Sequence, residues 1–144
     1  MATPDEVRAA IKVGREALVD AITGAADNWE KAPQEGDGED AWSARQVAEH
    51  VIPAEVFFAG AVCKACGYAG PESPISGKPQ FATAAEAQAA LEQVVAAADS
   101  KIKYVSEEDL SHTHETMGSV ESLMRMTAWH LLDHAMQMQT AASS

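Results

Sequence analysis

The sequence predicts an all-α protein built as a four-helix bundle. Four stretches carry apolar residues at alternating spacings of three and four, and a helix-capping residue precedes each of them. No stretch shows the two-residue alternation that is typical of a β-strand. With 144 residues, 47% of them hydrophobic, the chain is long enough to bury one core, so we expect a single domain over residues 1–144.

The first helix is expected over residues 4–27. Thr3 can cap its free amides, Pro4 suits the first helical position, and Glu6 completes a Thr-x-x-Glu capping box. Its apolar stripe consists of Val7, Ile11, Gly14, Leu18, Ile22 and Ala25. Residues 28–41 lack a sustained period and contain a proline and two glycines, which predicts a loop.

The second helix begins after Ser43, which forms another capping box with Gln46, while Trp42 can pack onto Val47. Gly67 is expected to end it. Its apolar stripe is predicted to consist of Val47, His50, Ala54, Phe57 and Ala61.

A second long connection is expected over residues 68–82, which contain three prolines. Thr83 and Glu86 then open the third helix, and Ser119 is the expected cap of the fourth, after a polar segment at 106–118. The third helix has the stripe Ala87, Leu91, Val94, Ala98, Ile102 and Val105, and the fourth has Val120, Leu123, Thr127, His130, His134 and Gln137.

The charge of the chain excludes several classes of partner. The formal net charge is −12, and no basic stripe could neutralise a phosphate backbone, so we expect no binding to nucleic acid or to an anionic membrane. No apolar run reaches the length of a membrane span. The first six residues contain neither a basic segment nor an apolar stretch, which favours a cytoplasmic location over secretion.

Three histidines occupy positions predicted to face the core: His50, His130 and His134. The last two are four residues apart, so they lie side by side on one helical face and can chelate one divalent ion. A third imidazole from another helix would complete a three-nitrogen set that leaves coordination positions open, which is typical of a catalytic site. In a zinc protease the residue after the first of two such histidines is a glutamate that acts as the base. Here that position is Leu131, so the protease base is missing. The alternative is a hydrogen-bonded polar layer that fixes the helix register.

A shared metal ion constrains the topology. The three histidines come within roughly 4 to 5 Å of one axial level if the second and fourth helices are antiparallel, but differ by roughly 10 Å if they are parallel. Antiparallel helices require one connection to cross the length of the bundle. Residues 68–82 could span about 50 Å when extended, although other long loops could also serve.

The sequence resembles the DinB/YfiT-like superfamily of metalloenzymes over residues 4–141. Trp42-Ser-Ala-Arg-Gln-Val-Ala-Glu-His50 is similar to the family's Trp-Ser-x-x-x-x-x-x-His, and His130-Leu-Leu-Asp-His134 is similar to its His-x-x-x-His. The resemblance implies an up-down-down-up bundle with its crossover between helices two and three. It also implies a divalent metal, often zinc or nickel, on residues matching His50, His130 and His134.

Characterised members of that superfamily include S-transferases and isomerases that use low-molecular-weight thiols such as mycothiol or bacillithiol. The resemblance therefore implies a metal-dependent transferase, or a hydrolase, whose metal deprotonates a thiol or a water and so activates it against a small-molecule substrate. Glu49, Asp133 and Gln137 are candidates for orienting the ligands or contacting substrate, although Glu49 and Asp133 could simply be solvated. The rival hypothesis is a noncatalytic helical module that binds metal or a partner.

Several other residues attract attention but carry weaker signals. Cys63 and Cys66 form a Cys-Lys-Ala-Cys near a helix end; without a second Cys/His pair, chance or packing explains them better than a metal or redox site. His112 and His114 are expected in a solvated loop. The tryptophans are expected in core or cap positions and the methionines in gaps of the core, but methionines on an outer helix face could instead mark a homodimer interface.

Overall fold

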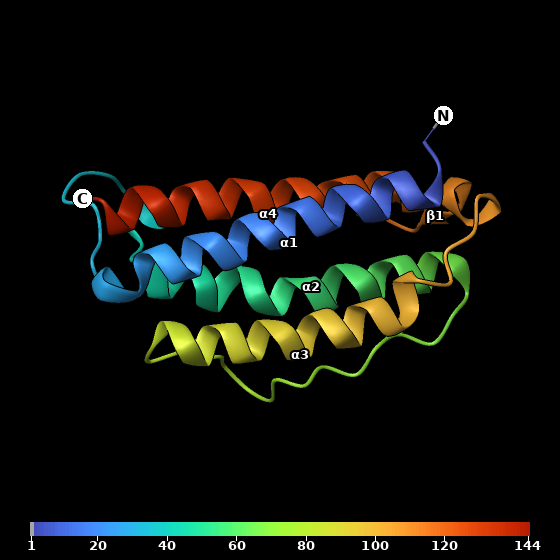
Figure 1. Cartoon of the computed structure of the whole chain (residues 1–144). Coiled ribbons are helices and arrows are strands. Elements are labelled where there is room, and N and C mark those ends of the chain that lie inside the picture. The colour runs from blue at the N-terminus through green and yellow to red at the C-terminus, as the bar shows by residue number, and fades with distance from the viewer. Residues whose placement is uncertain (1) are drawn as a thin grey trace.

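A computed structural model describes residues 2–144, so Met1, the first residue of the predicted domain, lies outside it. Four long helices dominate the fold (Figure 1). They are α1 (Pro4–Ala25), α2 (Ala44–Cys66), α3 (Ala84–Ile102) and α4 (Val120–Ala142). Short elements fill the connections: the 3-10 turns η1 (Ala26–Asn28), η2 (Gly38–Ala41) and η3 (Glu108–Ser111), and the strands β1 (Thr113–His114) and β2 (Gly118–Ser119).

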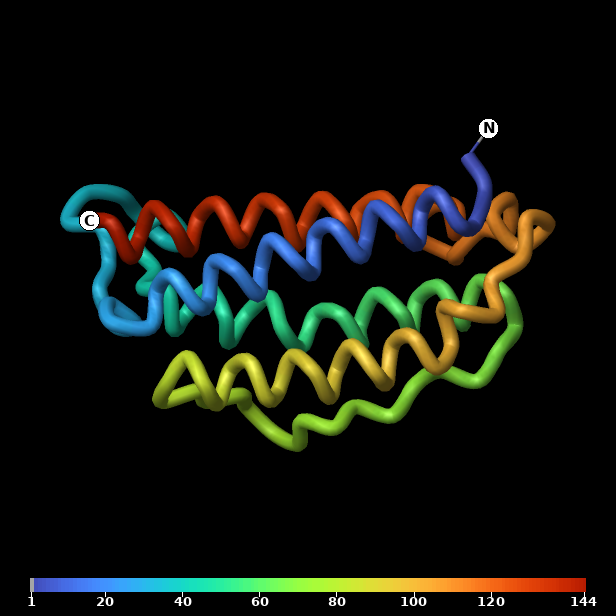
Figure 2. The backbone as a smooth tube through the Cα atoms, viewed as in Figure 1, coloured from blue at the N-terminus to red at the C-terminus, as the bar shows by residue number. Residues whose placement is uncertain are grey.

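The order of directions is up-down-down-up, as predicted. Figure 2 shows α2 and α3 running the same way, while α1 and α4 both run the opposite way. The connection at residues 67–83 returns along the whole length of α3 to join the two parallel helices. It is therefore the crossover, and α2 and α4 are antiparallel neighbours.

The predicted helix starts are confirmed by their hydrogen bonds, although the capping box predicted at Thr3 is only half formed, because the structure has no bond from the amide of Thr3 to the side chain of Glu6. The side chain of Thr3 accepts from the backbone amide of Glu6, and complete capping boxes form at Ser43 and at Thr83. At the other end of α2, Gly67 takes the left-handed conformation with φ +78°, which is typical of a helix terminator. The α1 helix ends two residues earlier than predicted, where its last turn tightens into η1.

The apolar stripes of α1 and α3 are confirmed, but that of α2 was predicted along the wrong edge. Phe57 is 64% exposed and His50 is exposed too, whereas Val51, Ile52 and Val62 are fully buried. Helix α2 packs against both α3 and α4, so its buried face is wide and is centred away from the histidine. The prediction for the tryptophans also fails at Trp129, which is 71% exposed.

The structure also bears on two other features, β-structure and membrane-spanning helices. The short antiparallel pair of β1 and β2 was not predicted, because two-residue strands are too short to show an alternating pattern. Across residues 2–144, we find no helix that combines the length and the apolar character needed to span a membrane.

Helices α1 and α4 pack more closely than any other pair, and Gly14 is the reason they can do so. A Cβ atom at Gly14 would lie 2.9 Å from the Cβ of Leu131 and 3.0 Å from the carbonyl oxygen of Ala128. Both distances are shorter than van der Waals contact, so the missing side chain sets the spacing of the two helices.

We expect Gly14→Ala to lower the free energy of unfolding by about 1–2 kcal/mol, because overpacking against α4 outweighs the helical preference of alanine. The matched control is Gly24→Ala on the same helix, where nothing lies within 4 Å of the added atom. That substitution should raise stability by about 0.5–1 kcal/mol. Urea denaturation of both variants measures the difference, and equal effects would contradict the close approach.

Candidate metal centre

The three predicted histidines lie together near the start of α2 and the second half of α4. Their closest ring nitrogens all lie within 4.8 Å of one another. The Nε2 atoms of His50 and His130 are 3.3 Å apart, and the ring centroids of His130 and His134 are 4.4 Å apart. Two nitrogens on one tetrahedral zinc ion are separated by about 3.3 Å, so this pair already has the required spacing.

A chain of hydrogen bonds fixes the orientation of His134. Gln137, one turn further along α4, donates from Nε2 to the backbone carbonyl of Glu39, which sets the orientation of the amide group. Its Oε1 is then the acceptor for Nδ1 of His134, at 2.7 Å. An amide oxygen can only accept, so His134 carries its proton on Nδ1 and keeps a lone pair on Nε2. The hydrogen bond between Gln137 and His134 therefore supports the predicted role of Gln137 in orienting a histidine.

The three rings differ in exposure, and the surroundings of His50 and His130 lower the pKa of both. His134 is 5% exposed, His130 is half-buried and His50 is exposed. Burial, followed by the neighbouring imidazoles, lowers the pKa of His130 to about 4. The same causes lower the pKa of His50, although the charge of Glu39 opposes the shift. Both imidazoles are therefore neutral at pH 7, which is the form that binds metal.

Aromatic side chains support two of the rings. Trp42 packs on His50 with 5.2 Å between ring centroids, and Phe58 meets His130 edge-on at 5.3 Å. Trp42 was predicted only as a packing residue at the helix start. Phe58 was not predicted as part of the site, and neither was Glu39, which acts through its backbone carbonyl and so leaves no residue-type signal.

Glu49 turns away from the histidines, so it does not serve as a contact to them. Its Oε2 accepts hydrogen bonds from Nε of Arg45 and from the backbone amide of Phe81, at 2.9 and 2.8 Å. Trp29 donates to the carbonyl of Phe81, and its own carbonyl accepts from the amide of Arg45. Together these bonds hold the end of the crossover and the loop after α1 against the first turns of α2.

Asp133 is exposed and lines a cavity of about 450 Å³ beside the histidines. The loop between α1 and α2 covers one side of this cavity and α4 forms the other. Its wall combines carboxylates with apolar surface and consists of Pro33, Glu35, Glu39, Asp40, Trp42, Asp133, Met136, Gln137 and Thr140. None of the three histidines lines the cavity, but Trp42, which packs on His50, and Gln137, which is hydrogen-bonded to His134, belong to its wall and connect it to the cluster.

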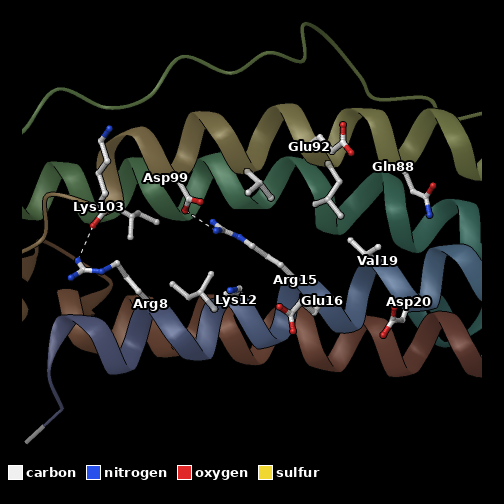
Figure 3. A pocket seen from close by; sticks show the side chains of 14 residues that line it. Arg8, Lys12, Arg15, Glu16, Val19, Asp20, Gln88, Glu92, Asp99 and Lys103 are labelled. Carbon is white, nitrogen blue, oxygen red and sulfur yellow. Dashed lines mark hydrogen bonds and ion pairs between the residues drawn. The ribbon is translucent and has the colours of Figure 1, made fainter.

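A larger cavity of about 880 Å³ lies elsewhere, between α1 and α3 (Figure 3). Arg15 crosses it to reach Asp99 and also donates to both oxygens of Glu55, which is 1% exposed. Its guanidinium is thus engaged by two carboxylates of the protein itself. We assign the candidate centre to the histidines, because Arg15, the guanidinium that crosses the larger cavity, is already paired and no cluster of metal-ligating side chains is found among the residues that line it.

The donor set fits a divalent transition metal. Neutral imidazoles suit zinc and nickel, and three of them leave at least one coordination position for a further ligand. The exposed His50 lies on the solvent side of the set, so the remaining positions can be reached from outside. This is the arrangement of an open site rather than of a closed structural one.

Comparison with known proteins supports the relationship that the motifs indicate. No curated protein and no solved structure matches the chain significantly. The sequence profile of the DinB superfamily, however, matches residues 10–138, a range that contains the three histidines and most of all four long helices. The chain therefore belongs to the DinB superfamily.

Proposed function

We propose that this protein is a divalent-metal-dependent enzyme whose ion, zinc or nickel, is held by His50, His130 and His134. The observation that carries the proposal is the convergence of three imidazole nitrogens within 4.8 Å while one of the rings stays open to solvent. In a purely structural polar layer, the histidines would hydrogen-bond to one another because they are shielded from water. An exposed histidine such as His50 can be satisfied by water and has no need of such partners.

A bound ion would supply Lewis acidity, lowering the pKa of a thiol or a water so that a nucleophile is available at neutral pH. The residues of the chain have separate tasks. Gln137 fixes the ring of His134, and Trp42 and Phe58 restrict the other two rings. A ligand set held in this way does not have to reorganise when substrate arrives.

The reaction we propose is transfer of a low-molecular-weight thiol onto a small electrophile, or hydrolysis of a small molecule. The cavity beside the histidines supports a small substrate, since about 450 Å³ accommodates a molecule of modest size. Trp42 and Met136 offer apolar contact, while Asp133 and Glu39 offer acceptors for hydroxyl or amino groups.

Removing a ligand should remove the metal. We expect His130→Ala and His134→Ala each to weaken zinc or nickel binding by more than about 100-fold. This loss exceeds the one that follows when a residue that only hydrogen-bonds a ligand is changed. The matched control is His114→Ala, a histidine in the connection before α4 that lies outside the cluster. Shifts of the imidazole NMR signals during a metal titration locate the ion, and equal losses in all three variants would indicate nonspecific binding.

The Gln137 contact gives a finer test. Gln137→Leu should weaken metal binding by about 10- to 100-fold, because His134 loses the acceptor that fixes its tautomer. Gln139→Leu, two residues further along the exposed side of α4, should leave the affinity unchanged. Isothermal titration of both variants makes the comparison. Identical affinities would show that Gln137 does not position the ring.

Activity is tested by incubating metal-loaded protein with low-molecular-weight thiols and electrophiles, and separately with hydrolysable esters and amides. We expect turnover that needs the metal and that His50→Ala abolishes, because the third ligand is lost. Turnover that survives this substitution would contradict the mechanism. Full metal occupancy without turnover across both panels would favour a noncatalytic module instead.

A further inference from the structure

A second group of metal-ligating side chains meets at the other end of the bundle. Cys66 is the last residue of α2, Asp109 belongs to η3, and His112 follows that turn directly. From His50 to Cys66 the chain advances 16 residues along α2, which corresponds to about 24 Å. This group is therefore far too distant to share an ion with the three histidines.

Local structure brings the three residues together. Gly67 reverses the chain at the end of α2, and the next residue, Tyr68, donates its hydroxyl to Oδ2 of Asp109 at 2.6 Å. The backbone amide of Ser106 donates to the same oxygen at 3.0 Å. The carboxylate is thus held from two sides, and its other oxygen, Oδ1, lies 3.5 Å from Nδ1 of His112.

The distances are close to those of a metal site. A sulfur of Cys66, a carboxylate oxygen of Asp109 and a ring nitrogen of His112 all lie within 4.8 Å of one another. Donors on one tetrahedral zinc ion are about 3.3 to 3.6 Å apart. Small rotations of Cys66 and of the exposed ring of His112 would close the difference, while Asp109 stays where its hydrogen bonds hold it.

Although burial opposes the shift, the hydrogen bonds of Asp109 lower the pKa of its carboxyl, and the carboxylate places a negative charge here that favours a cation. Asp109 is 5% exposed, Cys66 is half-buried, and the side chain of His112 is 41% exposed, so the group is enclosed on one side and accessible on the other. Burial, the charge of Asp109 and the neighbouring Cys63 raise the pKa of the Cys66 thiol to about 11. A divalent ion between sulfur and carboxylate would remove this penalty, and the thiol proton would pass to solvent on binding.

We propose that Cys66, Asp109 and His112 form a second site, for a thiophilic divalent cation such as Zn²⁺, that ties the end of α2 to the connection before α4. The mixed sulfur, oxygen and nitrogen donors suit zinc. Water supplies the fourth position on the exposed side. Cys63, one turn earlier and 1% exposed, is outside the ligand set.

Cobalt titration of the reduced protein tests the proposal. A thiolate ligand gives a near-ultraviolet sulfur-to-cobalt charge-transfer band, which three histidines cannot give, so the result does not depend on the fate of the other centre. We expect one such band per chain, lost in Cys66→Ser and kept in Cys63→Ala. His112→Gln should weaken cobalt binding at this site, followed through the charge-transfer band, by about 10-fold or more, since one of three ligands is lost. His114→Gln should leave that affinity unchanged.

Alkylation provides a second readout. Trypsin cleaves after Lys64 and places the two cysteines on different peptides, so mass spectrometry can follow each thiol separately. Zn²⁺ should slow the reaction of Cys66 with iodoacetamide in the wild-type protein, and His112→Gln should need about 10-fold more Zn²⁺ for the same protection. Absence of the cobalt band, its loss in Cys63→Ala rather than in Cys66→Ser, or alkylation of Cys66 at the same rate with and without Zn²⁺ would overturn the proposal.

Discussion

The antiparallel pairing of α2 and α4 is the constraint on which the rest of the molecule depends. His50 lies early in α2 and His134 lies late in α4, so their rings reach one level only because the two helices run in opposite directions. That pairing requires one connection to cross the length of the bundle, and in this chain the crossover joins α2 to α3. The hydrogen bonds of Trp29, Arg45 and Glu49 around Phe81 then hold the end of the crossover against the first turns of α2, the helix that carries His50.

Most of the fold and the identities of the three clustered histidines could be predicted from the sequence, because caps and periodicity are local properties. How far each imidazole ring is exposed to solvent could not be predicted from the sequence. A stripe of period 3.6 gives the direction of an apolar face but not its width, and the contacts of α2 with two neighbours moved its buried centre away from His50 and Phe57. The contact between Gln137 and Glu39 also escaped, because one partner is a backbone carbonyl.

The approach of Cys66 to Asp109 and His112 could not be predicted for a related reason. The sequence shows two cysteines without a matching pair nearby, and the missing donors lie more than forty positions away in a segment without periodicity. The left-handed turn at Gly67 and the hydroxyl of Tyr68, with contacts between α2 and β1, bring that segment onto the end of α2. Two potential ligand clusters thus lie at opposite ends of one helix, each completed by residues distant in sequence.

The close packing of α1 on α4 has a consequence for synthesis of the chain on the ribosome. Ile11 and Leu18 lie on the face of α1 that the finished bundle buries, yet α4 is the last of the four helices to be translated. Until it emerges from the exit tunnel, that face lacks its main cover and is open to chaperones or to neighbouring nascent chains. Folding of this protein should therefore be completed late, after translation of α4.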